Sequence, residues 1–292
     1  MLQVIREDMK AIALLMLELV AIAVSAAAQE RPYFVTYSHE MEEPGNLDIE
    51  LFSAVGKPPG ANRFLGSDIE FEYGVKTWWT TEFYMDGQAT VNDSTIFTGY
   101  RWENRFRPML REHWINPVIY VEFENISADK TLREVVGHDG VPDFAAPNWL
   151  ARQDKAREIE TKLILGSNYR GWNISENLIA EKNLSNGPWE FGYAWAVSRP
   201  FKLAASTHKC VFCAERFQAG LEMYGGLGDR YSLGLNRTSH YVGPTVDWST
   251  PGNLTLSFSP QVGLNDYSIP RIYRFGIRYE IEQVLGILRG GN

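Results

Sequence analysis

The chain has 292 residues, a formal net charge of −8 and two cysteines. This length suits one large all-β barrel as well as two smaller domains, so it excludes neither arrangement. The acidic balance argues against nucleic acid as a partner, because the sequence offers no basic stripe that could neutralise phosphates.

The first element is an apolar run over residues 11–24, which small residues follow. Ala26 and Ala28 fit the cleavage site of a secretory signal peptide that covers residues 1–28. The competing interpretation is a transmembrane anchor, but the run is shorter than the roughly 20 residues that a spanning helix needs. Acidic residues before the run are unusual for a signal peptide, and translation from Met9 instead of Met1 would remove them.

Residues 29–46 combine a short alternating piece, which includes Tyr33, Val35 and Tyr37, with the turn-like sequence Glu-Glu-Pro-Gly-Asn. Counting this piece as a strand would give an odd number of strands in the barrel described next. We therefore predict a periplasmic or lumen-plugging segment.

Between residues 47 and 282, apolar and aromatic residues alternate with polar ones in twelve short runs. A period of two is typical of β-strands with one apolar and one polar face. The predicted strands cover residues 47–52, 68–75, 78–85, 96–105, 119–124, 158–166, 172–181, 189–197, 217–223, 242–248, 254–258 and 272–281.

The two faces of these strands differ in a way that favours a membrane. One face is too charged for a dry core, and the other carries too many Trp, Tyr and Phe residues for contact with water. A strand that faces lipid on one side and an aqueous lumen on the other needs this combination. The predicted fold is all-β, a transmembrane antiparallel β-barrel of about 12 strands in the outer membrane of a Gram-negative bacterium. A secreted soluble β-sandwich or β-barrel is the alternative.

An even strand count also predicts which connections share an end. If the last strand ends in the periplasm, the periplasmic connections lie near Lys76, 107–115, Tyr169, 199–215 and Pro251. The longest connection, residues 126–157, then lies outside, where long loops are expected. A tail over residues 283–292 would follow the barrel.

The alternation also assigns single residues to a face. It places Ile96 and Thr98 on the lipid face and Phe97 on the lumen face. Glu176 falls on the lipid face, which is unfavourable for a carboxylate unless a β-bulge shifts the register.

The predicted lumen face holds far more acids than bases. The acids are Asp48, Glu50, Asp68, Glu70, Glu72, Glu82, Glu103, Glu122, Glu124, Glu158, Glu160, Glu181, Glu190, Glu222, Asp247 and Glu280, and the bases are Arg101, Arg105, Lys162, Arg274 and Arg278. Lining charges set selectivity, so an open lumen would favour cations or neutral compounds. We expect a passive channel or transporter for small solutes. In the alternative, these groups pair across strands and fill a structural, plugged barrel.

Three further motifs offer chemistry. Cys210 and Cys213 form a Cys-x-x-Cys motif, for which we predict a disulfide in an oxidising periplasm, since matched metal or haem ligands are not adjacent. His138 and Asp139, in the long connection, could bind a metal or act as a base, although loop polar residues are usually solvated. A membrane-embedded hydrolase or lipid-modifying enzyme would need Ser, His and an acid together. Ser239-His240 is the close Ser/His pair, but no nucleophile motif surrounds it. We expect no catalytic residue, metal or cofactor.

The end of the chain carries a family resemblance. Arg274, Gly276, Ile277, Tyr279 and Ile281 resemble the C-terminal assembly signal of bacterial outer-membrane barrels, although here the eleven residues Glu282–Asn292 follow it. Together with the run Ser259–Ser268, this region resembles the outer-membrane barrels labelled "MetA pathway of phenol degradation". The resemblance implies a barrel that helps small hydrophobic or aromatic compounds cross, with the barrel-assembly machinery, outer-membrane lipid and lipopolysaccharide as partners. The sequence leaves the oligomeric state open.

Overall fold

The computed structural model describes residues 32–127, 130–131, 135–204 and 210–284. The predicted signal peptide, residues 1–28, lies outside these residues, as does most of the predicted tail, 283–292. Among the residues that are described, no helix is long and apolar enough to cross a membrane.

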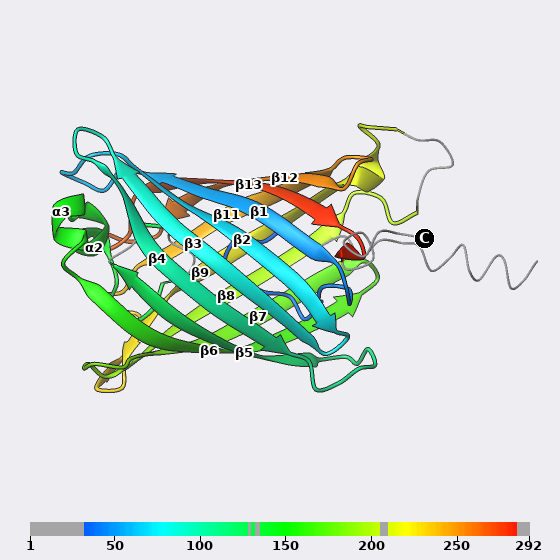
Figure 1. Cartoon of the computed structure of the whole chain (residues 1–292), viewed down its shortest axis with the longest axis horizontal. Coiled ribbons are helices and arrows are strands. Elements are labelled where there is room, and N and C mark those ends of the chain that lie inside the picture. The colour runs from blue at the N-terminus through cyan, green and yellow to red at the C-terminus, as the bar shows by residue number, and fades with distance from the viewer. Residues whose placement is uncertain (1–31, 128–129, 132–134, 205–209, 285–292) are drawn as a thin grey trace, which may run out of the picture. The chain divides into compact units, whose positions relative to one another are not determined.

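Within the described residues, twelve antiparallel strands close into a barrel (Figure 1). Each strand pairs with its neighbours in chain order, and the first pairs with the last, Leu47 opposite Ile281. The barrel strands are β1 (Leu47–Gly56), β2 (Phe64–Lys76), β3 (Trp79–Thr90), β4 (Thr95–Phe106), β5 (Asn116–Ser127), β6 (Lys155–Tyr169), β7 (Trp172–Asn183), β8 (Trp189–Pro200), β9 (Phe217–Asp229), β11 (His240–Ser249), β12 (Leu254–Gly263) and β13 (Arg271–Ile281). The predicted fold class is therefore confirmed.

Four short elements complete the assignment of the described residues: β10 (Ser232–Leu233), which pairs with β9, α2 (Val141–Ala145), α3 (Asn148–Ala151) and η1 (Ala214–Arg216). Because successive strands are antiparallel, connections alternate between two ends of the barrel. We call the end with the β2–β3, β4–β5, β6–β7, β8–β9 and β11–β12 connections the turn end. The opposite end, the loop end, holds the β5–β6 connection with α2 and α3 (Figure 1).

The alternation of residues explains why these strands form a closed barrel. In β13, Arg274 is fully buried inside, whereas the adjacent Phe275 is 45% exposed on the outer face. A period of two sends successive side chains to opposite faces of a strand. Most apolar and aromatic side chains of the strands therefore point outward, and most polar side chains point into the lumen.

The facing of the first residues of β4 differs from the sequence prediction. Ile96 and Thr98 are buried, at 3% and 6% exposure, while Phe97 is 66% exposed. The pairing of β3 with β4 shifts register at this point. Asp86 pairs with Gly99 and the next residue, Gly87, pairs with Phe97, so Thr98 has no partner on β3. This bulge moves Ile96 and Thr98 to the lumen and Phe97 outward, and the prediction for these three residues was wrong.

Glu176 lies on the outer face, between Ile174 and Leu178, and is exposed. Its pairings with Leu165 of β6 and Trp195 of β8 are regular, so no bulge turns it inward.

Candidate functional site in the barrel lumen

The charged residues of the lumen form clusters between neighbouring strands. Arg101 of β4 donates from Nη2 to Asp86 Oδ1 at 2.9 Å and from Nε to Asp86 Oδ2 at 3.1 Å. Asp68 of β2 and Glu122 of β5 lie 3.7 and 3.5 Å from the same guanidinium. All four side chains are buried. One arginine therefore binds acids from three other strands, β2, β3 and β5.

A second cluster surrounds Arg105, two inward positions further along β4. Its guanidinium forms ion pairs with Glu72 and Glu82, and Nε donates to Glu82 Oε1 at 2.6 Å. Glu103 lies 3.3 Å from the same Nε. The fork of an arginine suits several carboxylates at once, because its five N–H groups point in fixed directions.

Other predicted bases are paired as well. Lys162 lies 2.9 Å from Glu160, and Arg278 lies 2.8 Å from Glu50 and 3.3 Å from Asp48. Arg274 instead donates to Tyr224 Oη at 2.6 Å and to Gln261 at 3.1 Å, and its guanidinium lies 5.5 Å from the ring centroid of Phe52.

Most residues predicted to line the lumen are buried within the barrel. These are Asp48, Glu50, Asp68, Glu70, Glu72, Glu82, Arg101, Glu103, Arg105, Glu122, Glu124, Glu160, Lys162, Glu181, Glu222, Asp247 and Arg274. Four predicted residues near strand ends, Glu158, Glu190, Arg278 and Glu280, are partly exposed.

The charged clusters lie on one side of the lumen, over β1–β6 and β13. The inward residues of β7, β8, β9, β11 and β12 are instead mostly small or neutral, among them Asn173, Ser175, Asn177, Ala194, Ala196, Ser198, Gln218, Thr245 and Ser259, all buried. Sequence reasoning missed this neutral wall because it singled out ionisable residues. The same alternation that located the acids would have found it.

Residues 32–42, which we call the inner segment, lie in the lumen along this neutral wall. The backbone N–H groups of Phe34, Val35 and Thr36 all donate to the carboxylate of Glu222 on β9. Their distances to Glu222 Oε1 are 3.2, 2.8 and 2.7 Å. Three consecutive amides thus bind one buried carboxylate.

Tyr37 is held through both its backbone and its ring. Its N–H donates to Asn177 Oδ1 at 2.6 Å, and its C=O accepts from Asn177 Nδ2 at 2.9 Å. The hydroxyl donates to Glu103 at 2.8 Å. The ring packs edge-on against Tyr120, with centroids 5.1 Å apart, and Lys162 Nζ lies 4.6 Å from its centroid. Tyr37 therefore spans the lumen from the neutral wall to the side that holds the charged clusters.

His39 continues the inner segment towards the turn end. Its buried ring lies over Gly166 of β6, and Nε2 is 2.9 Å from Glu112 Oε1. Burial lowers the pKa of His39, and the neighbouring Glu112 acts in the opposite direction. Beyond the segment, Gly45 N–H donates to Gly74 C=O at 2.8 Å, which fixes the chain at the start of β1.

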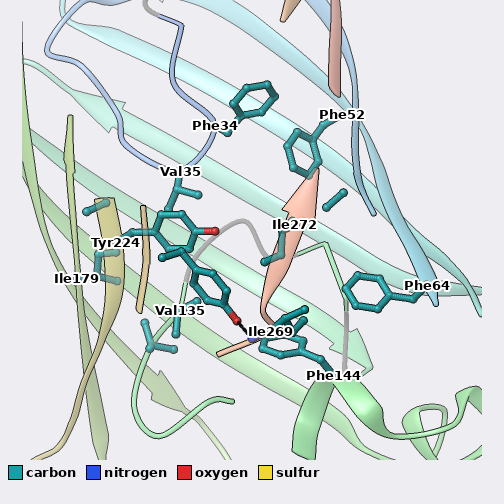
Figure 2. Packing of buried hydrophobic residues seen from close by; sticks show 14 residues of the cluster. Phe34, Val35, Phe52, Phe64, Val135, Phe144, Ile179, Tyr224, Ile269 and Ile272 are labelled. Atoms are coloured by element: carbon teal, nitrogen blue, oxygen red, sulfur yellow. Dashed lines mark hydrogen bonds between the residues drawn. The ribbon is translucent and has the colours of Figure 1, made fainter. Parts of the chain in front are cut away.

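An apolar cluster fills the lumen towards the loop end. Phe34 and Val35 of the inner segment and Val135 and Phe144 of the β5–β6 connection belong to this cluster (Figure 2). Ile269 of the β12–β13 connection closes the cluster together with wall residues, among them Phe52, Phe64, Ile179, Tyr224 and Ile272. Burial of these side chains favours the arrangement by about 25 cal/mol for each Å² removed from water. The inner segment and the connection thus occupy the lumen together.

Two groups of buried carboxylates lie close enough to hold a cation: Glu70, Glu72 and Glu82, and Glu122, Glu124 and Glu160. In the first group, Arg105 pairs with Glu72 and Glu82. In the second group, Lys162 pairs with Glu160. Basic side chains therefore already supply positive charge to both groups.

The motifs that suggested other chemistry lie at the barrel ends. Cys210 and Cys213 are joined by a disulfide in the β8–β9 connection. Ser239 Oγ donates to the backbone C=O of Asp139 at 2.8 Å. His240 Nε2 lies 2.8 Å from Thr238 Oγ1. In the described residues, Ser239 and His240 thus contact other groups and form no nucleophile–base pair.

The sequence matches no protein-family model, and no curated protein matches it either. Among solved structures, the chain is similar to the COG4313 outer membrane channel from Pseudomonas putida F1, with a TM-score of 0.53 and 10% identity over 83% of this chain and 97% of that one. It is also similar to the KdgM porin, with a TM-score of 0.50 and 6% identity over 80% of this chain and 98% of that one. These similarities establish the fold as a closed 12-strand antiparallel barrel like those of outer-membrane channels.

Proposed function

We propose that this chain is a passive channel for small solutes in the bacterial outer membrane, and that the inner segment closes it in the conformation described above. The observation that carries the proposal is the position of residues 32–42. They lie inside the closed barrel and bind its wall through side chains such as Glu222 and Asn177, without pairing as a strand.

The outer face supports a membrane location. Trp102, Phe275 and Tyr279 are 54%, 45% and 48% exposed there. An outward apolar and aromatic face with a polar interior is what a barrel in lipid requires. The long β5–β6 connection supports the loop end as the extracellular side, which leaves the turn end in the periplasm. Contact with lipopolysaccharide and assembly by the barrel-assembly machinery follow from this proposal.

Opening would require the inner segment to move while the wall stays intact. The wall strands pair around the whole circumference, and displacing one would break a ladder of backbone hydrogen bonds. The inner segment instead binds through side-chain contacts that water can replace, since Glu222 and Asn177 would be hydrated in an open lumen. The tether near Gly45 would hold the displaced segment close to the turn end.

The path that opens when the inner segment leaves would run between the charged clusters and the neutral wall. The predicted bases on this path are paired, so the excess of carboxylates would favour cations or neutral compounds over anions. The resemblance to the MetA phenol-degradation barrels adds small aromatic compounds as candidate solutes. The apolar cluster around Phe52 and Tyr224 would suit their passage.

Planar-bilayer recording tests the proposal. The mature chain, starting at Gln29, should insert and conduct rarely, whereas a variant that lacks residues 29–42 should give discrete conductance steps with a cation-selective reversal potential under a salt gradient. If the deletion variant inserts as a folded barrel, by heat-modifiable gel mobility and circular dichroism, and stays silent, the barrel is structural and the channel proposal fails.

A further inference from the structure

The wall contacts of the inner segment recognise peptide backbone more than side chains. Glu222 accepts the N–H groups of three consecutive residues, Phe34 to Thr36, with one carboxylate. Every amino acid except proline carries a backbone N–H group, so almost any peptide can supply these three donors. The carboxylate also accepts from Gln261 Nε2 at 3.1 Å, which orients it towards the segment.

Asn177 extends this backbone recognition by one residue. Its carboxamide donates to the C=O of Tyr37 and accepts from the N–H of the same residue. A neighbouring β-strand offers the same pair of contacts, so Asn177 replaces one rung of a ladder. A buried carboxamide that satisfies both backbone groups of one residue suits a peptide unit better than it suits a sugar ring or an alkyl chain.

Polar groups on both sides of the lumen bind the hydroxyls of two aromatic side chains, which lie four residues apart in the inner segment. Tyr33 Oη donates to Asn173 Oδ1 at 2.8 Å and lies within hydrogen-bond distance, 2.9 Å, of Ser198 Oγ. Tyr37 Oη donates to Glu103 at 2.8 Å. The other wall residues along this path are small, which leaves room for the chain.

We propose that the wall around Glu222 and Asn177 is a binding site for an extended peptide with aromatic side chains, and that the inner segment occupies this site as an internal ligand. This inference deepens the proposed function, since it rests on the inner segment leaving the lumen, and it makes short peptides a solute class of the channel. The Glu222 carboxylate disfavours an acidic side chain at the peptide positions that contact it.

The test uses the variant that lacks residues 29–42 and a synthetic peptide with the sequence of residues 32–41. The peptide should block the current of this variant in a concentration-dependent manner. Glu222→Gln and Asn177→Ala, each made in the deletion background, should raise the half-blocking concentration at least about tenfold, because hydrogen bonds to a charged or buried acceptor are lost. Glu176→Gln is the matched control. It removes a carboxylate from the outer face of β7, the strand that carries Asn177, and should leave the block unchanged.

A second peptide isolates backbone recognition. It has the same side chains but carries N-methyl groups on the amides of Phe34, Val35 and Thr36, so it cannot donate to Glu222. The inference expects this peptide to block at least about tenfold more weakly. It is overturned if the methylated peptide blocks as well as the parent, or if neither peptide blocks at millimolar concentration while the deletion variant conducts. An oligosaccharide that blocks where the parent peptide does not would also overturn it.

Binding can be measured without conduction. Fluorescence anisotropy of the labelled peptide with the detergent-solubilised deletion variant should show saturable binding that Glu222→Gln weakens. If the variant is silent in bilayers but binds in this way, the channel proposal fails while the peptide site stands. An absence of saturable binding to the folded variant overturns the peptide site.

Discussion

The position of the inner segment can be tested by adding one methyl group to the wall. Gly166 of β6 faces the lumen beneath His39, and a Cβ at this position would lie 2.1 Å from His39 Nδ1 and 2.8 Å from His39 Cβ. Rotation of the ring cannot move His39 Cβ, which is fixed to the backbone of the inner segment. Gly166 does not have a positive φ, so alanine is compatible with the β6 backbone itself. Gly166→Ala should therefore act on the closed state alone.

The size of the effect follows from the cost of overpacking. Forcing an extra carbon into a filled site costs about 1–3 kcal/mol. At about 1.4 kcal/mol for each tenfold change, the ratio of open to closed channels should rise between about fivefold and about 140-fold.

Single-channel recording measures this ratio directly. Two variants serve as controls. Gly166→Ala combined with His39→Gly removes the clashing atoms and should restore the closed state, and Gly166→Ala in the variant lacking residues 29–42 should not change its conductance. An unchanged open fraction in Gly166→Ala, with a deletion variant that conducts, would falsify the packing of His39 against Gly166 as the contact that keeps the lumen closed.

Three further predictions concern the same lumen. Tyr37→Phe removes the hydroxyl that donates to Glu103 at 2.8 Å. Because a hydrogen bond to a charged group is lost, the open fraction in single-channel recordings should rise at least about tenfold. An unchanged open fraction contradicts this role. Burial raises the pKa of Asp139 to about 8, so the docked β5–β6 connection should be most stable below about pH 4, the ordinary range of an Asp, and lose stability as the pH rises through 8. Hydrogen exchange of this connection should follow that dependence in the native chain and lose it in Asp139→Asn; equal pH profiles would refute it. Glu70→Gln with Glu122→Gln should shift the reversal potential of the deletion variant towards zero, and an unshifted potential would mean that these acids do not set selectivity.

The predicted strand facing was correct where the alternation is unbroken and wrong at one bulge. In β13 the pattern around Arg274 and Phe275 predicted the observed faces, because a period of two decides facing within a single strand. Ile96 and Thr98 were misplaced because the register shift depends on how β4 pairs with β3. A shift of one residue flips every side chain beyond it. A pattern read along one strand does not contain that information.

The sequence also predicted many charges in the lumen but left open whether they pair. Arg101 meets Asp68, Asp86 and Glu122 from three other strands. Their distances depend on strand stagger around the closed barrel, which is a property of the whole sheet. Asp86 was missed because the predicted strand ended one residue before it.

By itself, the sequence determined an even-stranded antiparallel barrel with an apolar outer face and a polar lumen, because each of these features follows from local periodicity and from the requirement to satisfy every backbone group in lipid. It also indicated that residues 29–46 stand apart from the strands. Only the tertiary structure decided where the described part of that segment lies. Glu222 meets the amide of Val35 across a sequence separation of 187 residues, and only closure of the barrel brings these two groups together.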